Sequence, residues 1–529
     1  MMLFDRFVQR AALAPSTTFC VVFEHGRPHV YSNGAVLSDA RRIFSLLKQN
    51  GIRTGMTVAI ILEHRRELYS SFIGSVLAGA IPSFLPPLTR KQDPEIFRHS
   101  MKMLMDRLEP SCLIGSGTTL PTADAADCLT LDVDALPTSS DAAGEGAPAA
   151  NVDQIAFLQH SSGTTGLKKG VSLSHRAVLT QIEAYASTIG LVPTDVVASW
   201  LPLYHDMGLI TGFLMPSVTG IPFVSIDALL WVAQPTVLLD AIEKYRATLA
   251  WMPNFAFHHL VRMAEPDRSW DLSSIRMMVN CSEPCRATAF DAFLSRFQAF
   301  GIVPEALQVS YAMAENVFAV TQTTSGQPVS RSSRAQYLDY LSSGRPIPGT
   351  EIRILNDDRE QVDDGVLGEI VISGNCLFDG YHKLPHLSTQ RLRDGWYASG
   401  DLGFMEDDEL FVVGRLDDVL NINGKKVIAH EIEAELNALD GIAPGRVLVY
   451  SDYDAESGAT QLFVAAETIE VFDDRRSNLP SAIRRAVFSG CGIRPHHISI
   501  VDRGFLLKST SGKISRQASI RKLLAKIQS

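Results

Sequence analysis

The fold is decided by the stretch Ile155-Ala-Phe-Leu-Gln-His-Ser-Ser-Gly-Thr-Thr-Gly-Leu-Lys-Lys-Gly170. Its first residues, 155–159, are a short apolar run that predicts a buried strand, and a helix is expected over 176–186. Between them, Ser161–Gly170 contains glycines that let the backbone turn inward and hydroxyls that donate hydrogen bonds, and Lys169 adds a positive charge. Such a loop suits a polyphosphate, although a Walker A spacing is absent. Taken alone, Ser-Ser-Gly-Thr-Thr-Gly would indicate an ordinary surface turn, but its position between a buried strand and a helix favours phosphate binding.

Short apolar runs alternate with helix-like stretches before this loop. Thr57–Leu62 and Cys112–Gly115 predict strands, whereas Ser38–Asn50 and Glu67–Ala80 predict helices. This alternation is typical of βαβ units, which build a mostly parallel sheet. The same pattern continues after the loop, as far as about residue 344. The sequence therefore predicts an α/β protein.

The pattern changes twice in the second half of the chain. Between residues 344 and 414, short strands and frequent turns predict a small β-barrel-like subdomain. After residue 415, separate strands and helices predict another domain, with the boundary near Asp417. We expect a large N-terminal domain (1–415), made of two α/β subdomains and the β-rich one, followed by a small α+β C-terminal domain (416–529).

Composition excludes several classes of protein. The chain has 529 residues, 48 Lys plus Arg and 58 Asp plus Glu, and a net charge of −10, which argues against a general nucleic-acid binder. Its seven cysteines are scattered without a CxxC pair, as in proteins of a reducing compartment. No signal-peptide core or apolar run of about 20 residues is evident. We expect a soluble cytoplasmic protein that does not bind membranes.

Two further motifs could bind a nucleotide. In Ser310-Tyr-Ala-Met-Ala-Glu315, Tyr311 could stack on a base while Glu315 holds Mg²⁺. In Trp396-Tyr-Ala-Ser-Gly-Asp401, the carboxylate of Asp401 could accept hydrogen bonds from ribose hydroxyls. Taken separately, each motif could also be purely structural.

Two more motifs place basic residues after turns. In Gly414-Arg-Leu-Asp-Asp418, Arg415 could donate a forked pair of hydrogen bonds to an anion or a sugar. In Lys508-Ser-Thr-Ser-Gly-Lys-Ile-Ser-Arg516, Lys513 projects from a Gly-Ser turn and could bring a point charge into a site. The alternatives are an ordinary turn and a solvated basic tail.

In this order, the five motifs resemble the adenylate-forming superfamily, which includes acyl-CoA synthetases, fatty acyl-AMP ligases, peptide-synthetase adenylation domains and luciferases. The resemblance implies that ATP converts a carboxylic acid into an acyl-adenylate and pyrophosphate, and that a thiol then takes the acyl group. It implies Lys513 and Glu315 as catalytic residues, Glu315 as the Mg²⁺ ligand, Asp417 as the hinge of a mobile C-terminal domain and Gly424 as facing the pantetheine arm. The nucleotide-binding residues would be Ser161, Ser162, Gly163, Thr164, Thr165, Gly166, Lys169, Ser282, Tyr311, Asp401 and Arg415.

The same resemblance implies an acid pocket. It would lie near His205, Asn254, Phe255, Ser282 and Met313. Apolar walls are expected from Phe255 and from three further aromatic residues: Trp251, Phe257 and Phe318. Asp206 is the obvious acidic residue there, and its His-Asp-Met-Gly setting indicates a structural role, so an uncharged acyl chain is favoured.

The acceptor stays open between two branches of the superfamily. Leu201–Ile210, Asn280–Pro284 and Ala312–Glu315 resemble fatty acyl-AMP ligases, which favours a fatty acid and the phosphopantetheine thiol of an acyl carrier protein. The segment 414–425 and the short stretch between Tyr381 and Gly395 look more like acyl-CoA synthetases, which use free CoA. A luciferase-type oxygenase shares the first half-reaction, and a non-catalytic nucleotide-binding homologue is the alternative from another class.

Overall fold

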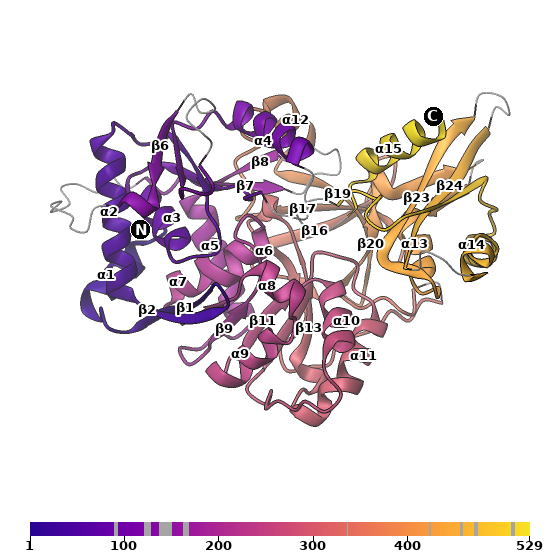
Figure 1. The fold of residues 1–529 in the computed structure, drawn as a ribbon, viewed down its shortest axis with the longest axis horizontal. Helices are drawn as coiled ribbons and strands as arrows, with labels where there is room; N and C mark the ends of the chain where they lie inside the picture. Colours follow the sequence, from indigo (N-terminus) through magenta and orange to yellow (C-terminus); the bar gives the residue numbers. More distant parts are fainter. Residues whose placement is uncertain are drawn as a thin grey trace. The chain divides into compact units, whose positions relative to one another are not determined.

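A computed structural model gives the fold of the protein (Figure 1). It describes residues 1–88, 94–120, 128–136, 151–161, 169–335, 337–422, 425–454, 459–469, 474–508 and 514–528. The chain divides into two compact units. Of the described residues, the first unit contains 1–161, 169–399 and 403–412, and the second contains 400–402 and those from 413 onward.

A four-stranded parallel sheet forms the N-terminal part of the first unit. Its strands lie in the order β4-β3-β5-β6 and comprise Ile81–Phe84, Thr57–Ile61, Cys112–Gly115 and Leu129–Asp132. All of β3 and β5 is buried, as expected of strands covered on both faces. The helices of this part are α1 (Asp5–Leu13), α2 (Asn33–Gln49), α3 (Glu67–Leu77) and α4 (Pro94–Leu108). Figure 1 shows α2 and α3 side by side.

A nine-stranded sheet forms the centre of the first unit. Its order is β15-β14-β13-β12-β11-β9-β10-β1-β2. The strands from β13 to β1 are parallel, and antiparallel strands close both edges. In that order the strands are Arg345–Pro346, Ala319–Gln322, Leu307–Ala312, Met277–Cys281, Leu249–Met252, Val197–Ser199, Phe223–Ser225, Thr18–Glu24 and Arg27–Ser32.

Helices cover both faces of this sheet. Along β11, Leu249 and Trp251 point into one hydrophobic cluster, whereas Ala250 and Met252 point into another. The two clusters lie on opposite faces because side chains alternate along a strand. The helices are α5 (His175–Thr188), α6 (Asp206–Leu209), α7 (Met215–Thr219), α8 (Ala228–Ala233), α9 (Val237–Tyr245), α10 (Asn254–Met263) and α11 (Ala287–Phe297). The predicted α/β class is confirmed.

The phosphate-loop segment differs from the expected strand–loop–helix order. After β7 (Ile155–Ser161) the chain returns as a second strand, β8 (Lys169–Ser174), which pairs antiparallel with β7 before α5 begins. The return strand forms because Val171 and Leu173 are apolar and fully buried. Ser174 then caps α5, since its hydroxyl accepts a hydrogen bond from the Ala177 amide. The loop therefore joins two strands of a hairpin.

The β-rich segment, most of which belongs to the first unit, is built as expected from antiparallel strands. They are β16 (Thr350–Leu355), β17 (Gly368–Gly374), β18 (Leu392–Arg393), β19 (Trp396–Glu406) and β20 (Glu409–Arg415). One short helix, α12 (Pro385–Arg391), interrupts them. It lies beside α4 (Figure 1), where Lys383 pairs with Glu109 at 2.6 Å.

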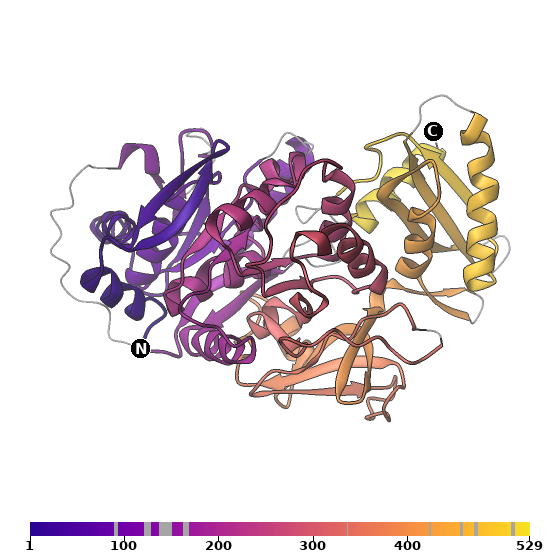
Figure 2. The ribbon, with the colours of Figure 1, turned by 90° about the horizontal axis from the view of Figure 1, so that it is seen from below.

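The second unit has a sheet of three strands, β23 (Ile442–Asp454), β24 (Ala459–Thr468) and β25 (His497–Val501). Val447 and Val449 pack in one cluster with α13 (Ala429–Asn437) and α14 (Asp474–Cys491). Leu448 and Tyr450 pack on the opposite face with α15 (Arg516–Gln528). Figures 1 and 2 show this unit as a sheet with helices on both sides. A hairpin of β21 (Val419–Ile422) and β22 (Lys425–Ile428) precedes it.

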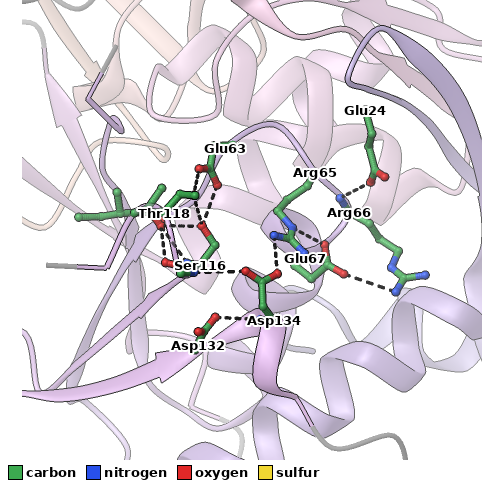
Figure 3. Close-up of polar contacts among 12 residues, drawn as sticks. Glu24, Glu63, Arg65, Arg66, Glu67, Ser116, Thr118, Asp132 and Asp134 are labelled. Carbon is green, nitrogen blue, oxygen red and sulfur yellow. Dashed lines mark hydrogen bonds and ion pairs between the residues drawn. The ribbon is translucent and has the colours of Figure 1, made fainter. Parts of the chain in front are cut away.

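The carboxyl edge of the small parallel sheet is occupied by a polar cluster (Figure 3). Glu63, which follows β3, accepts hydrogen bonds from Thr118 and, at 2.9 Å, from Ser116, both of which follow β5. Burial opposes ionisation of Glu63, but these hydroxyls outweigh it and lower the pKa of its carboxyl. Beside it, Arg65 pairs with Asp134 at 2.8 Å. The polar side chains at this edge are therefore hydrogen-bonded or ion-paired to one another.

No helix among the described residues has the length and apolar character needed to cross a bilayer.

Candidate active site

The carboxyl edge of the nine-stranded sheet gathers seven of the predicted site residues. Its order places β9 between β10 and β11, so the chain runs outward from β9 in both directions. Ligands of open α/β sheets bind at such a switch point, outside the carboxyl ends of the strands. The residues at the ends of these strands, or in the segments that follow them, are His205, Asn254, Phe255, Ser282, Tyr311, Met313 and Glu315.

Glu315 stands on a strained turn between β13 and β14. Val317 has φ 63° and ψ −55°, a conformation that costs a β-branched residue on the order of 1–3 kcal/mol. The Phe318 amide donates to the Asn316 carbonyl at 2.7 Å and closes a γ-turn. From α5, the buried amide of Gln181 donates to the carbonyl of Asn316 at 2.8 Å. The surrounding structure therefore holds the Glu315 turn in one conformation.

The carboxylate of Glu315 is buried and accepts a hydrogen bond from a tyrosine. The Tyr381 hydroxyl donates to Glu315 Oε1 at 2.7 Å, and the Tyr397 hydroxyl lies 3.1 Å from that of Tyr381. Sequence reasoning used Tyr381 only as a landmark and missed this contact. The available signal was a tyrosine directly after Gly380, but nothing in the spacing pointed to a partner 66 residues earlier.

The ends of the phosphate loop are fixed, whereas its centre (Ser162, Gly163, Thr164, Thr165 and Gly166) lies outside the described residues. Ser161 ends β7 and Lys169 begins β8. The free edge of β8 pairs with the segment that carries Tyr381, since the Ser172 amide donates to the Gly380 carbonyl at 3.0 Å. Lys169 Nζ lies 5.2 Å from the centre of the Tyr381 ring. The structure thus brings Lys169 and Glu315 to the same tyrosine.

Around the expected acid pocket, the structure changes the set of aromatic residues. Phe255, at the start of α10, is 43% exposed and lies edge-on to Trp200 and Trp231, whose rings stack 3.6 Å apart. Neither tryptophan was predicted, because one follows β9 and the other lies on α8. The expected walls Trp251, Phe257 and Phe318 are buried in the hydrophobic clusters, as Trp200 and Trp231 are. Their strand and helix positions point them into the core.

A hydrogen bond between two asparagine side chains fixes Asn254, which lies beside Phe255. Asn254 accepts a hydrogen bond from the side chain of Asn280 at 2.8 Å, and Asn280 is fully buried at the end of β12.

The other predicted residues at this edge differ in exposure. Ser282, directly after β12, is exposed and has φ 73°. Tyr311 is buried on β13, and Met313 is buried directly after that strand. The ring of His205 lies 4.9 Å from that of Tyr204, at the start of α6.

Asp401 and Arg415 form an ion pair. Arg415 Nε donates to Asp401 Oδ1 at 3.0 Å, and the two residues lie on the paired strands β19 and β20. Asp401 is buried, whereas Arg415 is exposed. Two residues that the motifs named separately are therefore neighbours, as a shared ligand would require.

Comparison with known proteins now identifies the family. The model of the family described as "AMP-binding enzyme" matches residues 7–382. The chain belongs to this family.

Two relatives of this AMP-binding enzyme are named as fatty-acid ligases. "Probable long-chain-fatty-acid--AMP ligase FadD30" of Mycobacterium tuberculosis is 29% identical, over 87% of this chain and 86% of that protein. The medium-chain-fatty-acid–(acyl-carrier-protein) ligase JamA of Moorena producens is 28% identical, over 71% of this chain and 69% of that protein. A solved structure from "Structural and Functional Studies of Fatty Acyl-Adenylate Ligases from E. coli and L. pneumophila" has the same fold, with a TM-score of 0.88 and 24% identity over 100% of this chain and 98% of that one. The chain is an AMP-forming acyl ligase, and such enzymes use ATP.

In the second unit of the AMP-binding enzyme, the predicted hinge Asp417 lies in a short 3₁₀ turn, Leu416–Asp418. Lys513 and Gly424 lie outside the described residues. The residues that flank the segment of Lys513 are described: Lys508 bridges Ile514, and the Ser515 amide donates to the Leu507 carbonyl at 2.8 Å.

Arg516, directly after Ser515, joins three elements of the AMP-binding enzyme. Its guanidinium lies 3.2 Å from Asp418 Oδ1 and 2.7 Å from Glu433 Oε1, and it donates to the Val449 carbonyl at 2.8 Å. The chain directly after Ser515 is thereby tied to the residue that follows the predicted hinge, to α13 and to β23. Sequence reasoning missed this clamp, because its partners are far apart along the chain.

Replacing Arg516 by methionine should destabilise the second unit in a pH-dependent way. Burial raises the pKa of Glu433 to about 7, although Arg516 opposes the rise. Because the unfolded pKa is about 4.3, only the folded state holds this proton between pH 4.3 and 7, so the free energy of unfolding falls as pH rises through that window. Above pH 7 Glu433 is ionised and Arg516 is its counter-charge. Arg516→Met should therefore lower the free energy of unfolding there by about 3–5 kcal/mol. At pH 5, protonated Glu433 needs no counter-charge, and the loss should be much smaller.

Calorimetric unfolding of the full-length variant at pH 5 and pH 8 measures this difference. Arg521→Met is a matched control, because Arg521 is exposed on the same helix. It should leave the transition unchanged at both pH values. Equal destabilisation by Arg516→Met at pH 5 and pH 8 would contradict the assigned charge pair.

Proposed function

We propose that this enzyme activates a fatty acid as acyl-AMP and transfers the acyl group to the phosphopantetheine thiol of an acyl carrier protein. The observation that carries the proposal is the buried carboxylate of Glu315, held by Tyr381 beside Lys169 at the carboxyl edge of the nine-stranded sheet. A nucleoside triphosphate requires a carboxylate that binds its cation and a positive side chain near its phosphates. Glu315 and Lys169 would supply these two groups.

The acid is proposed from the surroundings of Phe255. Its ring is exposed and is backed by two buried, stacked tryptophans, which gives an apolar surface that suits a hydrocarbon chain. Two relatives are named as fatty-acid ligases, which supports the same choice. His205 and Asn254 would orient the carboxylate, while Met313 would contact the chain.

In the first half-reaction, a carboxylate oxygen of the acid attacks the α-phosphorus of ATP, and the bond to the bridging oxygen of pyrophosphate breaks. Ser161–Gly166 and Lys169 would hold the β- and γ-phosphates, Tyr311 would stack on adenine, and Ser282 would line the nucleotide site. Asp401 and Arg415 would bind the ribose. Lys513 would stabilise the charge that develops on oxygens around the α-phosphorus.

Glu315 fits a magnesium ligand. Among the described residues, no three His, Cys, Asp or Glu side chains cluster as a metal site. Glu315 is the carboxylate that we propose as the protein ligand. Mg²⁺ is commonly held by one or two carboxylates, with phosphates and water completing the shell. When bound, the ion would supply positive charge to the phosphates during displacement.

In the second half-reaction, the thiol sulfur bonds to the acyl carbon, AMP leaves with the former anhydride oxygen, and the thiol proton is lost. The C-terminal domain would turn about Asp417 between the two steps, bringing Gly424 to the pantetheine arm. A carrier protein is proposed as the acceptor because JamA is named as a ligase for one. Free CoA is the alternative acceptor, favoured by the short segment between Tyr381 and Gly395.

Pyrophosphate exchange across a panel of fatty, aryl and amino acids tests the activation step. We expect exchange with fatty acids, and its absence with every acid would overturn the proposal. Thioester yield with CoA and with a phosphopantetheinylated carrier protein then identifies the acceptor. Comparable rates with both would contradict the preference for a carrier protein.

A further inference from the structure

We propose that Tyr381 is a positioning residue for Glu315, whose carboxylate it fixes from the edge of strand β8. The inference deepens the proposed function and rests on the role proposed for Glu315 as the ligand of a divalent cation.

The contact between the two side chains is short and buried. The Tyr381 hydroxyl donates to Glu315 Oε1 at 2.7 Å, and the exposed fractions of the two residues are 4% and 8%. A hydrogen bond to an ionised group is stronger than a neutral one, and burial strengthens it further. The bond fixes the orientation of the carboxylate and engages Oε1, so Oε2 is the oxygen not held by Tyr381.

The direction of the hydrogen bonds follows from the single proton of each hydroxyl. Because Tyr381 gives its proton to Glu315, the proton of Tyr397 must point to the Tyr381 oxygen across their 3.1 Å separation. Tyr381 is therefore the donor to the carboxylate, and Tyr397 is the donor to Tyr381.

The backbone of the same residue is paired with the strand that leaves the phosphate loop. Tyr381 bridges Val171, and the neighbouring His382 amide donates to the Gly170 carbonyl at 2.7 Å. On its other side, the Phe378 amide donates to the backbone carbonyl of Glu315 at 2.9 Å. One short segment thus contacts both β8 and the Glu315 turn. The segment of Tyr381 therefore holds both the Glu315 turn and the end of the phosphate loop. The sequence motifs did not indicate this connection.

Groups that orient a metal ligand through a hydrogen bond affect metal affinity without touching the metal. Their loss commonly lowers affinity about 10–100-fold. Without the Tyr381 hydroxyl, the carboxylate would regain rotational freedom, and ordering it would oppose cation binding. A purely structural tyrosine would lower thermal stability without this effect.

Tyr381→Phe tests the proposal, with Tyr397→Phe as the matched control. Both changes remove one buried hydroxyl from the same cluster, but only the first removes the bond to Glu315. The readout is Mn²⁺ binding to the full-length enzyme with a non-hydrolysable ATP analogue, followed by electron paramagnetic resonance. We expect the Mn²⁺ dissociation constant to rise at least about tenfold in Tyr381→Phe and less than about threefold in Tyr397→Phe. In pyrophosphate exchange, the Mg²⁺ requirement should rise similarly.

Glu315→Gln separates this inference from the proposed function. If Glu315→Gln weakens Mn²⁺ binding but a folded Tyr381→Phe binds it as the wild type does, the Tyr381 inference is wrong and Glu315 keeps its role. An equal rise in both tyrosine variants would also overturn the inference, because general loosening of the cluster would then explain it. If Glu315→Gln leaves Mn²⁺ binding unchanged, the role proposed for Glu315 is itself wrong.

Discussion

Glu315→Gln should lower Mg²⁺-dependent pyrophosphate exchange about a hundredfold or more. Glutamine keeps the volume of the side chain, and its Oε1 can still accept the hydrogen bond from the Tyr381 hydroxyl. What it removes is the negative charge, so the cation should be bound more weakly and the charge developing on the phosphates should be less stabilised. The loss should therefore appear in the rate and in the Mg²⁺ requirement.

The matched control for this change is Glu183→Gln. Glu183 is an exposed surface residue that pairs with Arg6 at 2.7 Å. An exposed pair of this kind contributes at most about 1 kcal/mol to stability, and exchange should be unchanged. If Glu315→Gln retained exchange within about threefold of the wild type while remaining folded, Glu315 would not be the ligand of the essential cation.

The large sheet and the strand-end residues could be predicted from the sequence, because both follow from local pattern. Buried parallel strands read as continuous apolar runs, and Thr57–Ile61 and Met277–Cys281 are such runs, buried throughout. A residue that follows such a strand must lie at the carboxyl edge of the sheet, whatever its neighbours are. Glu315 follows strand β13 and lies at that edge, although its motif was predicted from residue types and order.

The contacts that organise the site could not be predicted, because they join segments that only tertiary packing brings together. Tyr381 and Glu315 are separated by 66 residues, and Arg516 and Glu433 by 83. The γ-turn at Val317 is also invisible in sequence, since a β-branched residue disfavours it and the cost is met by distant groups such as Gln181. Strand β8 was not predicted, because its two apolar residues, Val171 and Leu173, form only a short alternating pattern directly before a helix.

Lys513→Ala should lower adenylation about 10²–10³-fold while leaving transfer from preformed acyl-AMP within about threefold of the wild type. In adenylation, negative charge builds up on oxygens around the α-phosphorus, and a lysine ammonium would stabilise it. In transfer, the thiol attacks the acyl carbon and AMP leaves, so that charge is already in place. The two half-reactions should therefore separate in this variant.

The structure indicates why the alanine change should leave the second unit folded. The residues that flank the segment of Lys513 are joined by the bridge between Lys508 and Ile514, and Arg516 fixes the next residues to Asp418 and Glu433. None of these contacts uses the lysine side chain. Lys526→Ala removes another lysine of the same unit, one that lies 5.1 Å from the Phe505 ring, and should leave both half-reactions unchanged. Equal losses of adenylation and transfer in Lys513→Ala would contradict the assigned role, because a lysine needed in both steps would act on the orientation of the domain and not on the α-phosphate.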